Sequence, residues 1–290
     1  MRRVSSIPSQ SGFTLVEAII AIVITGIVAG IVAVFIVRPV QGYLDTVRRA
    51  GMTDTADTAL RRMAYEIRSA VPNSVRVDPT GRFVEFIPTR DGGRYRAQRD
   101  GAGCAVASPA DPIFDVDDCS AAGASRFDVL GPPVTGFNGD FVVIFNTGQA
   151  GLDAYQPGQN RRMIFTAGSK VWFQPTATVF PPFESPFQRF QIVPGTGPVS
   201  FGCVPAAAAP GNGGLALHRF SSYRSGNDNW SAQPVALTGQ SALLASDLAT
   251  CGFTYQALSA ANGLLILRLA VQRENETITL VHEVHVDNTP

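Results

Sequence analysis

Residues 12–37 read GFTLVEAIIAIVITGIVAGIVAVFIV, and Glu17 is the only charged side chain among them. As a helix, residues 13–37 would be about 37 Å long, whereas the hydrocarbon core of a bilayer is about 30 Å thick. The stretch is therefore long enough to span a membrane. Arg2 and Arg3 precede it. Because positive charge stays on the cytoplasmic side, we expect the N-terminus to remain cytoplasmic and the rest of the chain to be exported.

Glu17 is the residue that a plain membrane anchor does not explain. An unpaired carboxylate at membrane depth costs at least about 2.5 kcal/mol on insertion scales. A secretory signal peptide does not fit either, since its apolar region has about 7–15 residues and ends at a cleavage site of small residues. Here the apolar region is longer and is followed by Arg38 and Pro39. We therefore expect Glu17 to have a partner.

Residues 12–17, GFTLVE, resemble the prepilin cleavage motif of type IV pilins and of type II secretion pseudopilins. The resemblance implies that a prepilin peptidase/methyltransferase cuts between Gly12 and Phe13 and methylates the new N-terminus at Phe13. It also implies that the first helix contacts other major and minor pilins. The protein would lie first in the bacterial inner membrane, with its C-terminal domain in the periplasm, and then in a pilus at the cell surface.

Cleavage would create the partner that Glu17 lacks. The new α-amine of Phe13 is positive, and Glu17 of a neighbouring subunit can pair with it. A lone buried charge is costly, whereas a paired one is tolerated, so the pair would form only when the second subunit sits at the right height. We therefore interpret Glu17 as an assembly residue that sets the register between subunits.

The composition beyond this stretch indicates a strand-rich globular protein. The chain has 290 residues, is 45% apolar and contains 28 Gly and 20 Pro, which is high for a helical protein. Lys+Arg and Asp+Glu both number 23, so the net charge gives no reason to expect a nucleic-acid partner.

Apolar side chains continue at helical spacing beyond the membrane segment, at Val40, Tyr43, Val47, Ala50, Ala56, Leu60, Met63, Ile67 and Val71. We expect Pro39 to kink or loosen this helix, its second half to pack on the globular domain, and its end to fall near Ala70, before Pro72. We expect four segments: a prepilin leader (1–12), the transmembrane half of the helix (13–37), its amphipathic half (38–71) and a periplasmic β-rich domain (72–290).

Short strand-like runs broken by Gly, Pro, Asn and Asp follow Pro72. They lie at residues 83–87, 141–145, 161–165, 170–173, 187–193, 199–204, 215–220, 252–256, 264–272 and 277–286. Residues 273–276 form a good hairpin connection between the last two, whereas residues 91–133 are predicted to be loop. A long helix followed by a mostly antiparallel sheet with long loops is an α+β fold.

The four cysteines are Cys104, Cys119, Cys203 and Cys251, and none forms a CxxC pair. Zinc ligands usually come in such pairs, so a zinc site is not expected. If the chain is exported to an oxidising compartment, two disulfides are the natural interpretation. Three pairings are possible. We favour Cys104–Cys119 and Cys203–Cys251, because each closes a loop within one neighbourhood of the chain. Four reduced core thiols are the alternative.

The sequence contains no recognisable catalytic motif. It lacks G-x-S-x-G, H-E-x-x-H and a phosphate-binding glycine loop. Of the three histidines, His282 and His285 lie three apart in a predicted strand, so they face opposite sides and make a poor metal pair. We therefore predict a protein that is not an enzyme and that holds no metal or cofactor.

Three further parts of the chain resemble minor pilins that help to initiate or cap a pilus for surface attachment. They are residues 72–77, residues 189–193 with 198–203, and residues 282–290. The J-type minor pseudopilin of type II secretion is an open alternative. Another alternative is a membrane-anchored periplasmic module that binds a glycan or a protein through exposed aromatic side chains. The candidate side chains are Trp172, Phe180, Phe183 and Trp230. The other interpretation of these four aromatics is that they pack in the core.

Overall fold

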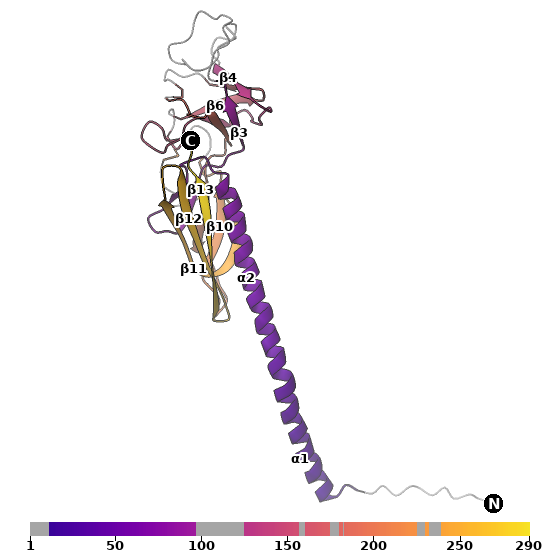
Figure 1. The fold of residues 1–290 in the computed structure, drawn as a ribbon. Coiled ribbons are helices and arrows are strands. Elements are labelled where there is room, and N and C mark those ends of the chain that lie inside the picture. The colour runs from indigo at the N-terminus through magenta and orange to yellow at the C-terminus, as the bar shows by residue number, and fades with distance from the viewer. Residues whose placement is uncertain are drawn as a thin grey trace, which may run out of the picture. The chain divides into compact units, whose positions relative to one another are not determined.

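The computed structural model describes residues 12–96, 125–156, 160–174, 180–181, 183–224, 230–231 and 239–290. The chain divides into two compact units, Met1–Gly51 and Met52–Pro290. In the first unit, helix α1 (Leu15–Val32) is followed by a π-helical turn η1 (Ala33–Val37) and by the start of helix α2, which covers Arg38–Arg68 (Figure 1). The remaining elements are strands, so the expected α+β order is confirmed.

The π-helical turn lies directly before Pro39, where the sequence predicts a kinked or loosened helix. Pro39 has no N–H to donate to the carbonyl of Phe35, and its ring crowds that carbonyl. A wider turn at Ala33–Val37 relieves this crowding without ending the helix. Helix α2 then continues to Arg68, two residues before its expected end near Ala70.

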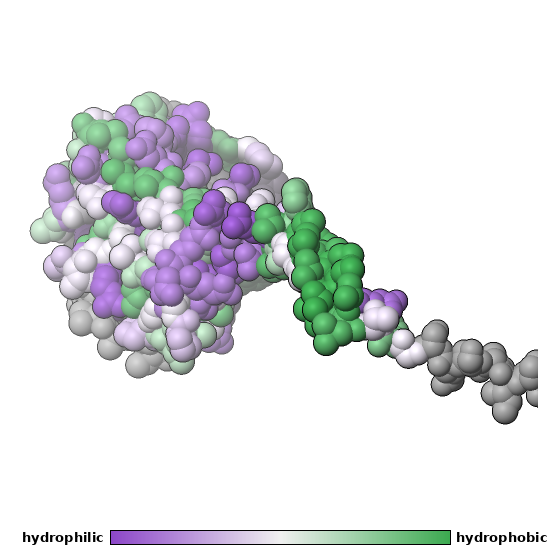
Figure 2. Space-filling view, turned by 90° about the horizontal axis from the view of Figure 1, so that it is seen from below, coloured by the Kyte–Doolittle hydropathy of each residue, from purple (hydrophilic) through white to green (hydrophobic). Residues whose placement is uncertain are grey.

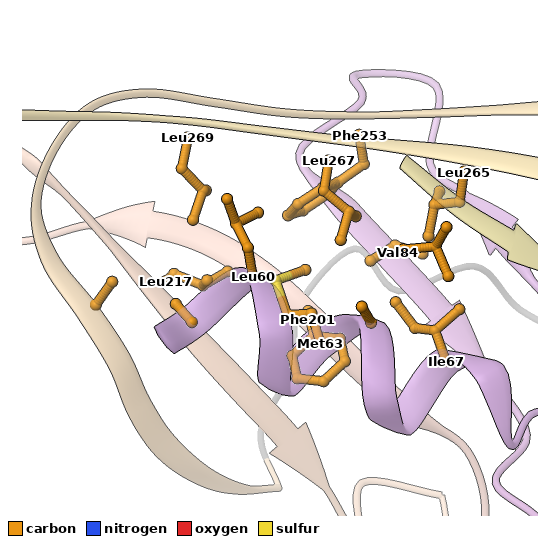
Figure 3. Packing of buried hydrophobic residues seen from close by; sticks show 14 of the residues in the cluster. Leu60, Met63, Ile67, Val84, Phe201, Leu217, Phe253, Leu265, Leu267 and Leu269 are labelled. Carbon is orange, nitrogen blue, oxygen red and sulfur yellow. The ribbon is translucent and has the colours of Figure 1, made fainter. Parts of the chain in front are cut away.

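The second half of α2 packs on a sheet through one face. Its buried side chains recur every three or four residues, at Met52, Ala56, Ala59, Leu60, Met63, Ala64 and Ile67. Leu60, Met63 and Ile67 point from the helix into a layer of strand side chains that includes Phe201, Leu217 and Leu267 (Figure 3). Earlier members of the expected stripe, such as Tyr43 and Val47, stay exposed.

The sheet under α2 has seven antiparallel strands in the order β1-β2-β9-β10-β11-β12-β13. Their bounds are Arg76–Val77, Phe83–Phe86, Val199–Pro205, Leu215–Ser221, Gln240–Ala257, Asn262–Arg273 and Glu276–Asp287. The last two strands form the expected hairpin. Glu274 and Asn275 connect them with φ values of 50° and 64°, and two such left-handed residues make a two-residue turn that matches the twist of a hairpin.

Strand β11 is much longer than its predicted core at residues 252–256. It pairs with β10 through its first half and with β12 through its second, and the register shifts between Leu248 and Thr250. Asp247 has a φ of 57°, so the strand turns at this point. After the turn, Phe253 N donates to Gly81 O at 2.8 Å, which brings β11 against the β1–β2 hairpin.

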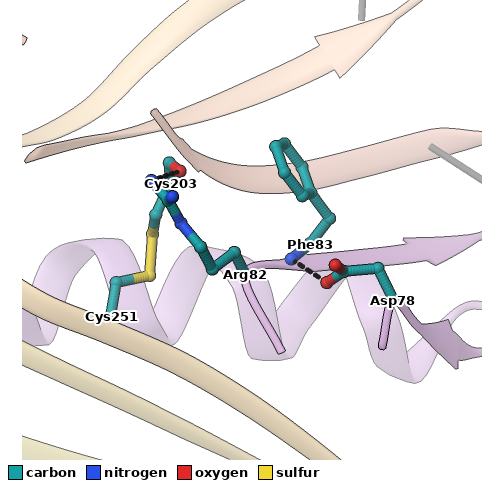
Figure 4. Close-up of a disulfide and its surroundings, with 5 residues drawn as sticks. All are labelled: Asp78, Arg82, Phe83, Cys203 and Cys251. Carbon is teal, nitrogen blue, oxygen red and sulfur yellow. Dashed lines mark hydrogen bonds between the residues drawn. A yellow bond between two sulfur atoms is a disulfide. The ribbon is translucent and has the colours of Figure 1, made fainter. Parts of the chain in front are cut away.

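A disulfide joins Cys203 of β9 to Cys251 of β11, with 6.3 Å between their Cα atoms (Figure 4). Arg82 lies beside it and donates from Nη2 to Cys203 O at 2.8 Å. This is one of the two pairings favoured by the sequence. The other, Cys104–Cys119, falls outside the described residues.

A closed barrel occupies the sequence between β2 and β9. Its six strands follow the order β3-β4-β7-β6-β5-β8, with bounds Asp91–Tyr95, Ser125–Leu130, Lys170–Phe173, Arg161–Ala167, Phe141–Val143 and Arg189–Val193. Aromatic side chains fill it, and the rings of Phe127 and Phe190 lie 4.9 Å apart. Because β2 pairs with β9, as at Phe86 and Val199, the chain leaves the sheet for the barrel and returns to it at neighbouring positions.

Strands β3 and β4 correct the prediction that residues 91–133 are loop. The segment Asp91–Tyr95 contains two consecutive glycines and has no alternating apolar pattern. At Gly92, however, an added Cβ would come within 2.9 Å of Phe190 O, so the close approach of β8 requires glycine. Tyr95 is fully buried in the barrel. Pairing with β8 therefore overrides the weak local preference for a strand.

A buried polar cluster holds the barrel to the sheet. The Glu85 carboxylate of β2 accepts from Arg76 Nη2 at 2.7 Å and has no exposed surface. The guanidinium of Arg161, from barrel strand β6, lies 3.5 Å from the ring centroid of the buried Trp230. Tyr155 donates to Ser74 O at 2.7 Å, and burial raises the pKa of its hydroxyl well above the usual value.

Candidate functional site

Helix α1 begins with a side-chain cap. Thr14 has φ −82° and ψ 150°, and its Oγ1 accepts from the backbone N–H of Glu17 at 3.2 Å. Since the helix starts at Leu15, Glu17 occupies its third position. Thr14 and Glu17 therefore have the spacing of a capping box, and the acidic side chain lies in the first turn, where the helix dipole favours it. Our sequence reasoning missed this motif, although the T-x-x-E spacing was there to find.

The cap places the expected cleavage bond outside the helix. Gly12 and Phe13 precede Thr14 in non-helical backbone, and Phe13 is 82% exposed. Thr14 bonds to the backbone N–H of Glu17 and not to its side chain, and among the residues that the structure describes the Glu17 carboxylate has no hydrogen bond or ion pair. The cleavage site at Gly12 and Phe13 and the assembly residue Glu17 are thus all exposed.

The apolar surface of α1 and η1 is uncovered. Neither element contains a buried side chain, and the aliphatic and aromatic residues along them are roughly half exposed or more. The continuous helix Leu15–Arg68 includes a segment long and apolar enough to cross a membrane. Figure 2 shows hydrophobic surface over this part of the helix. Such a surface marks a membrane or protein contact.

Two glycines give this surface a site of close approach. Gly26 and Gly30 form a G-x-x-x-G pair, and an added Cβ at either would meet nothing within 4 Å. Nothing in the described chain therefore requires glycine at these positions. Small residues at this spacing let a second helix come close in a bilayer or filament.

Replacing Thr14 tests the cap directly. Thr14→Val keeps the branched shape but removes the Oγ1 acceptor, whereas Thr14→Ser keeps the acceptor. Losing a cap costs about 1 kcal/mol, so the Glu17 amide should exchange with solvent about fivefold faster in Thr14→Val and nearly as in wild type in Thr14→Ser. Hydrogen exchange of the full chain in detergent micelles measures this. Equal rates in the two variants would show that Oγ1 does not cap the helix.

The other sequence candidates separate into core and surface. Trp230 and Phe180 are buried, so for these two the core alternative holds. Trp172 is half-buried, and the Arg126 guanidinium lies 4.6 Å from its ring centroid. Phe183 is exposed. The four aromatics therefore do not form the exposed binding surface that the binding-module alternative requires.

His282 and His285 occupy opposite faces of β13, the first half-buried and the second exposed. Within the described ranges, no three His, Cys, Asp or Glu side chains are grouped as a metal site would need.

Comparison with known proteins gives one match. Residues 7–33 match the prokaryotic N-terminal methylation motif. No curated protein and no solved structure matches the chain. The motif supports a type IV pilin-like or pseudopilin-like prepilin, which implies processing by a prepilin peptidase and association with a membrane. The matched segment contains the capped helix start and most of the uncovered apolar helix.

Proposed function

We propose that this chain is a minor type IV pilin, a structural subunit that is made as a precursor and cut between Gly12 and Phe13. The match of residues 7–33 to the methylation motif carries the proposal. The capped helix supports it, since the bond between Gly12 and Phe13 lies in exposed, non-helical backbone next to the membrane helix. Methylation then falls on the new N-terminus at Phe13.

The uncovered helix anchors the subunit and later joins it to others. Residues 13–37 span the inner membrane, residues 38–71 leave it, and residues 72–290 lie in the periplasm before the subunit enters a pilus. The Glu17 carboxylate, which has no partner in the described part of the chain, pairs with the Phe13 α-amine of a neighbouring subunit. A structural role of this kind needs no catalytic residue.

We assign the subunit to the MshO type, a minor pilin of the mannose-sensitive haemagglutinin pilus that helps to initiate or cap assembly. The segments that resemble this type meet around the end of α2. Asn73 donates from its backbone N to Asn288 Oδ1 at 3.2 Å and from Nδ2 to Asn288 O at 2.9 Å. The segment at residues 189–193 and 198–203 supplies β8 and most of β9. The sequence resemblance of these three segments carries the assignment to this type.

The location of the protein tests this assignment. A tagged chain should appear in small amounts in filaments sheared from the cell surface, and deletion of the chain should reduce the number of filaments. A J-type pseudopilin predicts the opposite result, in which secretion of folded proteins fails while filaments are unchanged. A periplasmic binding module predicts neither effect, with the tagged chain remaining in the membrane fraction.

A further inference from the structure

A trough runs along the outside of the barrel where β3 pairs with β8. Its volume is about 310 Å³, and it is lined by Gly92, Gly93, Arg94, Arg189, Phe190 and Gln191. It is continuous with a second hollow of about 420 Å³, since Gly92, Arg189 and Gln191 line both. The second hollow also receives Arg68 from the end of α2 and Thr289 near the C-terminus. Segments distant in sequence thus contribute polar side chains to one groove.

Two arginines lie side by side in the trough without a carboxylate between them. Arg94 and Arg189 are directly opposite in the β3–β8 ladder, and both are exposed. Among the described residues neither has an ion pair. Arg94 Nε donates to Phe187 O at 3.1 Å, and the Arg189 guanidinium lies 5.3 Å from the centre of the Phe187 ring. Like charges directly opposite on a sheet are destabilising, and among the described residues no ion pair offsets the repulsion between these two arginines.

The acidic residues of the groove do not neutralise this pair. Asp91 Oδ1 and Oδ2 accept from the backbone N–H groups of Gly92 and Thr135, at 2.8 and 2.7 Å. Asp287 Oδ1 accepts from Thr289 N at 2.8 Å. Arg90, which lines the second hollow, pairs with Asp140 at 2.9 Å. The terminal nitrogens of Arg94 and Arg189 therefore remain available to an anion from outside.

We propose that this groove binds a carboxylated sugar, with the carboxylate held between Arg94 and Arg189. Guanidinium groups match a carboxylate in shape and charge. The exposed ring of Phe187, beside Arg94 and Arg189, offers an apolar surface to the face of a sugar ring, and Gln191 offers an amide to its hydroxyls. This binding role is additional to the assembly role proposed above and does not depend on it.

Calorimetry of the full chain in detergent micelles tests the proposal, with a trisaccharide of galacturonic acid as ligand and a trisaccharide of galactose as its uncharged counterpart. Only the galacturonic acid trisaccharide should bind, and added salt should lower its affinity. Arg189→Gln and Arg94→Gln should each reduce the affinity at least about tenfold, the range of a charge-assisted hydrogen bond. Arg61→Gln, the same change on an exposed arginine of α2 that pairs with Asp57, should leave the affinity unchanged.

A fold control separates binding from stability. Because each groove variant removes a like-charge contact, its thermal midpoint should equal or exceed that of wild type. The proposal is overturned if the wild type does not bind the uronic acid, if galactose binds equally well, or if Arg61→Gln weakens binding as much as Arg189→Gln. Binding of inorganic phosphate with the same arginine dependence, and no binding of the uronic acid, would overturn the assignment of a sugar.

Discussion

Replacing Glu17 by alanine is expected to leave cleavage after Gly12 intact and to lower the amount of the protein in sheared filaments about a hundredfold. The physical reason is the charge left behind. Without Glu17, the α-amine of a neighbouring Phe13 would be buried among apolar helices with no counter-charge. Removing one partner of a buried pair in this way costs about 3–5 kcal/mol. Electrophoretic mobility reports cleavage, and immunoblots of filament and membrane fractions report incorporation.

Two further variants assign the effect to charge. Glu17→Gln keeps the size and polarity of the side chain, so it should fail to assemble nearly as badly as Glu17→Ala. Asp45→Ala removes an exposed carboxylate from α2 that pairs with Arg48 at 2.6 Å, and it should assemble as wild type does. Normal incorporation of Glu17→Ala would refute the register interpretation, whereas cleavage is judged separately from electrophoretic mobility.

Loss of the Cys203–Cys251 disulfide should have the largest effect on stability. The bridge closes a loop with a sequence separation of 48, which is worth about 4 kcal/mol in the chain-entropy model. That is a large fraction of the roughly 5–15 kcal/mol that stabilises a typical domain. The double variant Cys203→Ala/Cys251→Ala should therefore show a much lower midpoint in urea, followed by the fluorescence of the buried Trp230.

The serine variant sharpens this test. Cys203 has no exposed surface, so a serine hydroxyl there would be buried in the apolar cluster beneath α2. Cys203→Ser/Cys251→Ser should be less stable than the alanine variant, by about 1–3 kcal/mol for an unsatisfied polar group. An alanine variant with the midpoint of wild type would show that the bridge does not contribute to stability.

The elements with a strong local pattern could be predicted from sequence. The stripe through Ala56, Leu60, Met63 and Ile67 predicts the packed face of α2, and all four side chains are buried. The alternation of Ile278, Leu280, Val284 and Val286 likewise predicts the inward face of β13. These patterns can be seen in the sequence because each lies within one short, continuous segment whose apolar side chains all face the same core.

The elements that depend on distant partners could not be predicted in the same way. Strand β3 has two glycines and little strand preference, and it exists because β8 lies against it. The same holds for the groove, since the opposition of Arg94 and Arg189 follows from a register that joins positions 95 residues apart in sequence. The start of α1 is different. Its T-x-x-E spacing is local, and a search for capping boxes would have found it.

The mass of the mature chain, isolated from membranes, tests the central claim most directly. The proposed processing predicts a protein that begins at Phe13 and carries one methyl group on its α-amine, with residues 1–12 absent. Fragmentation of the N-terminal peptide would place the methyl group. A mature protein that retains Met1 would contradict the proposal and would leave residues 13–37 as an uncleaved membrane anchor.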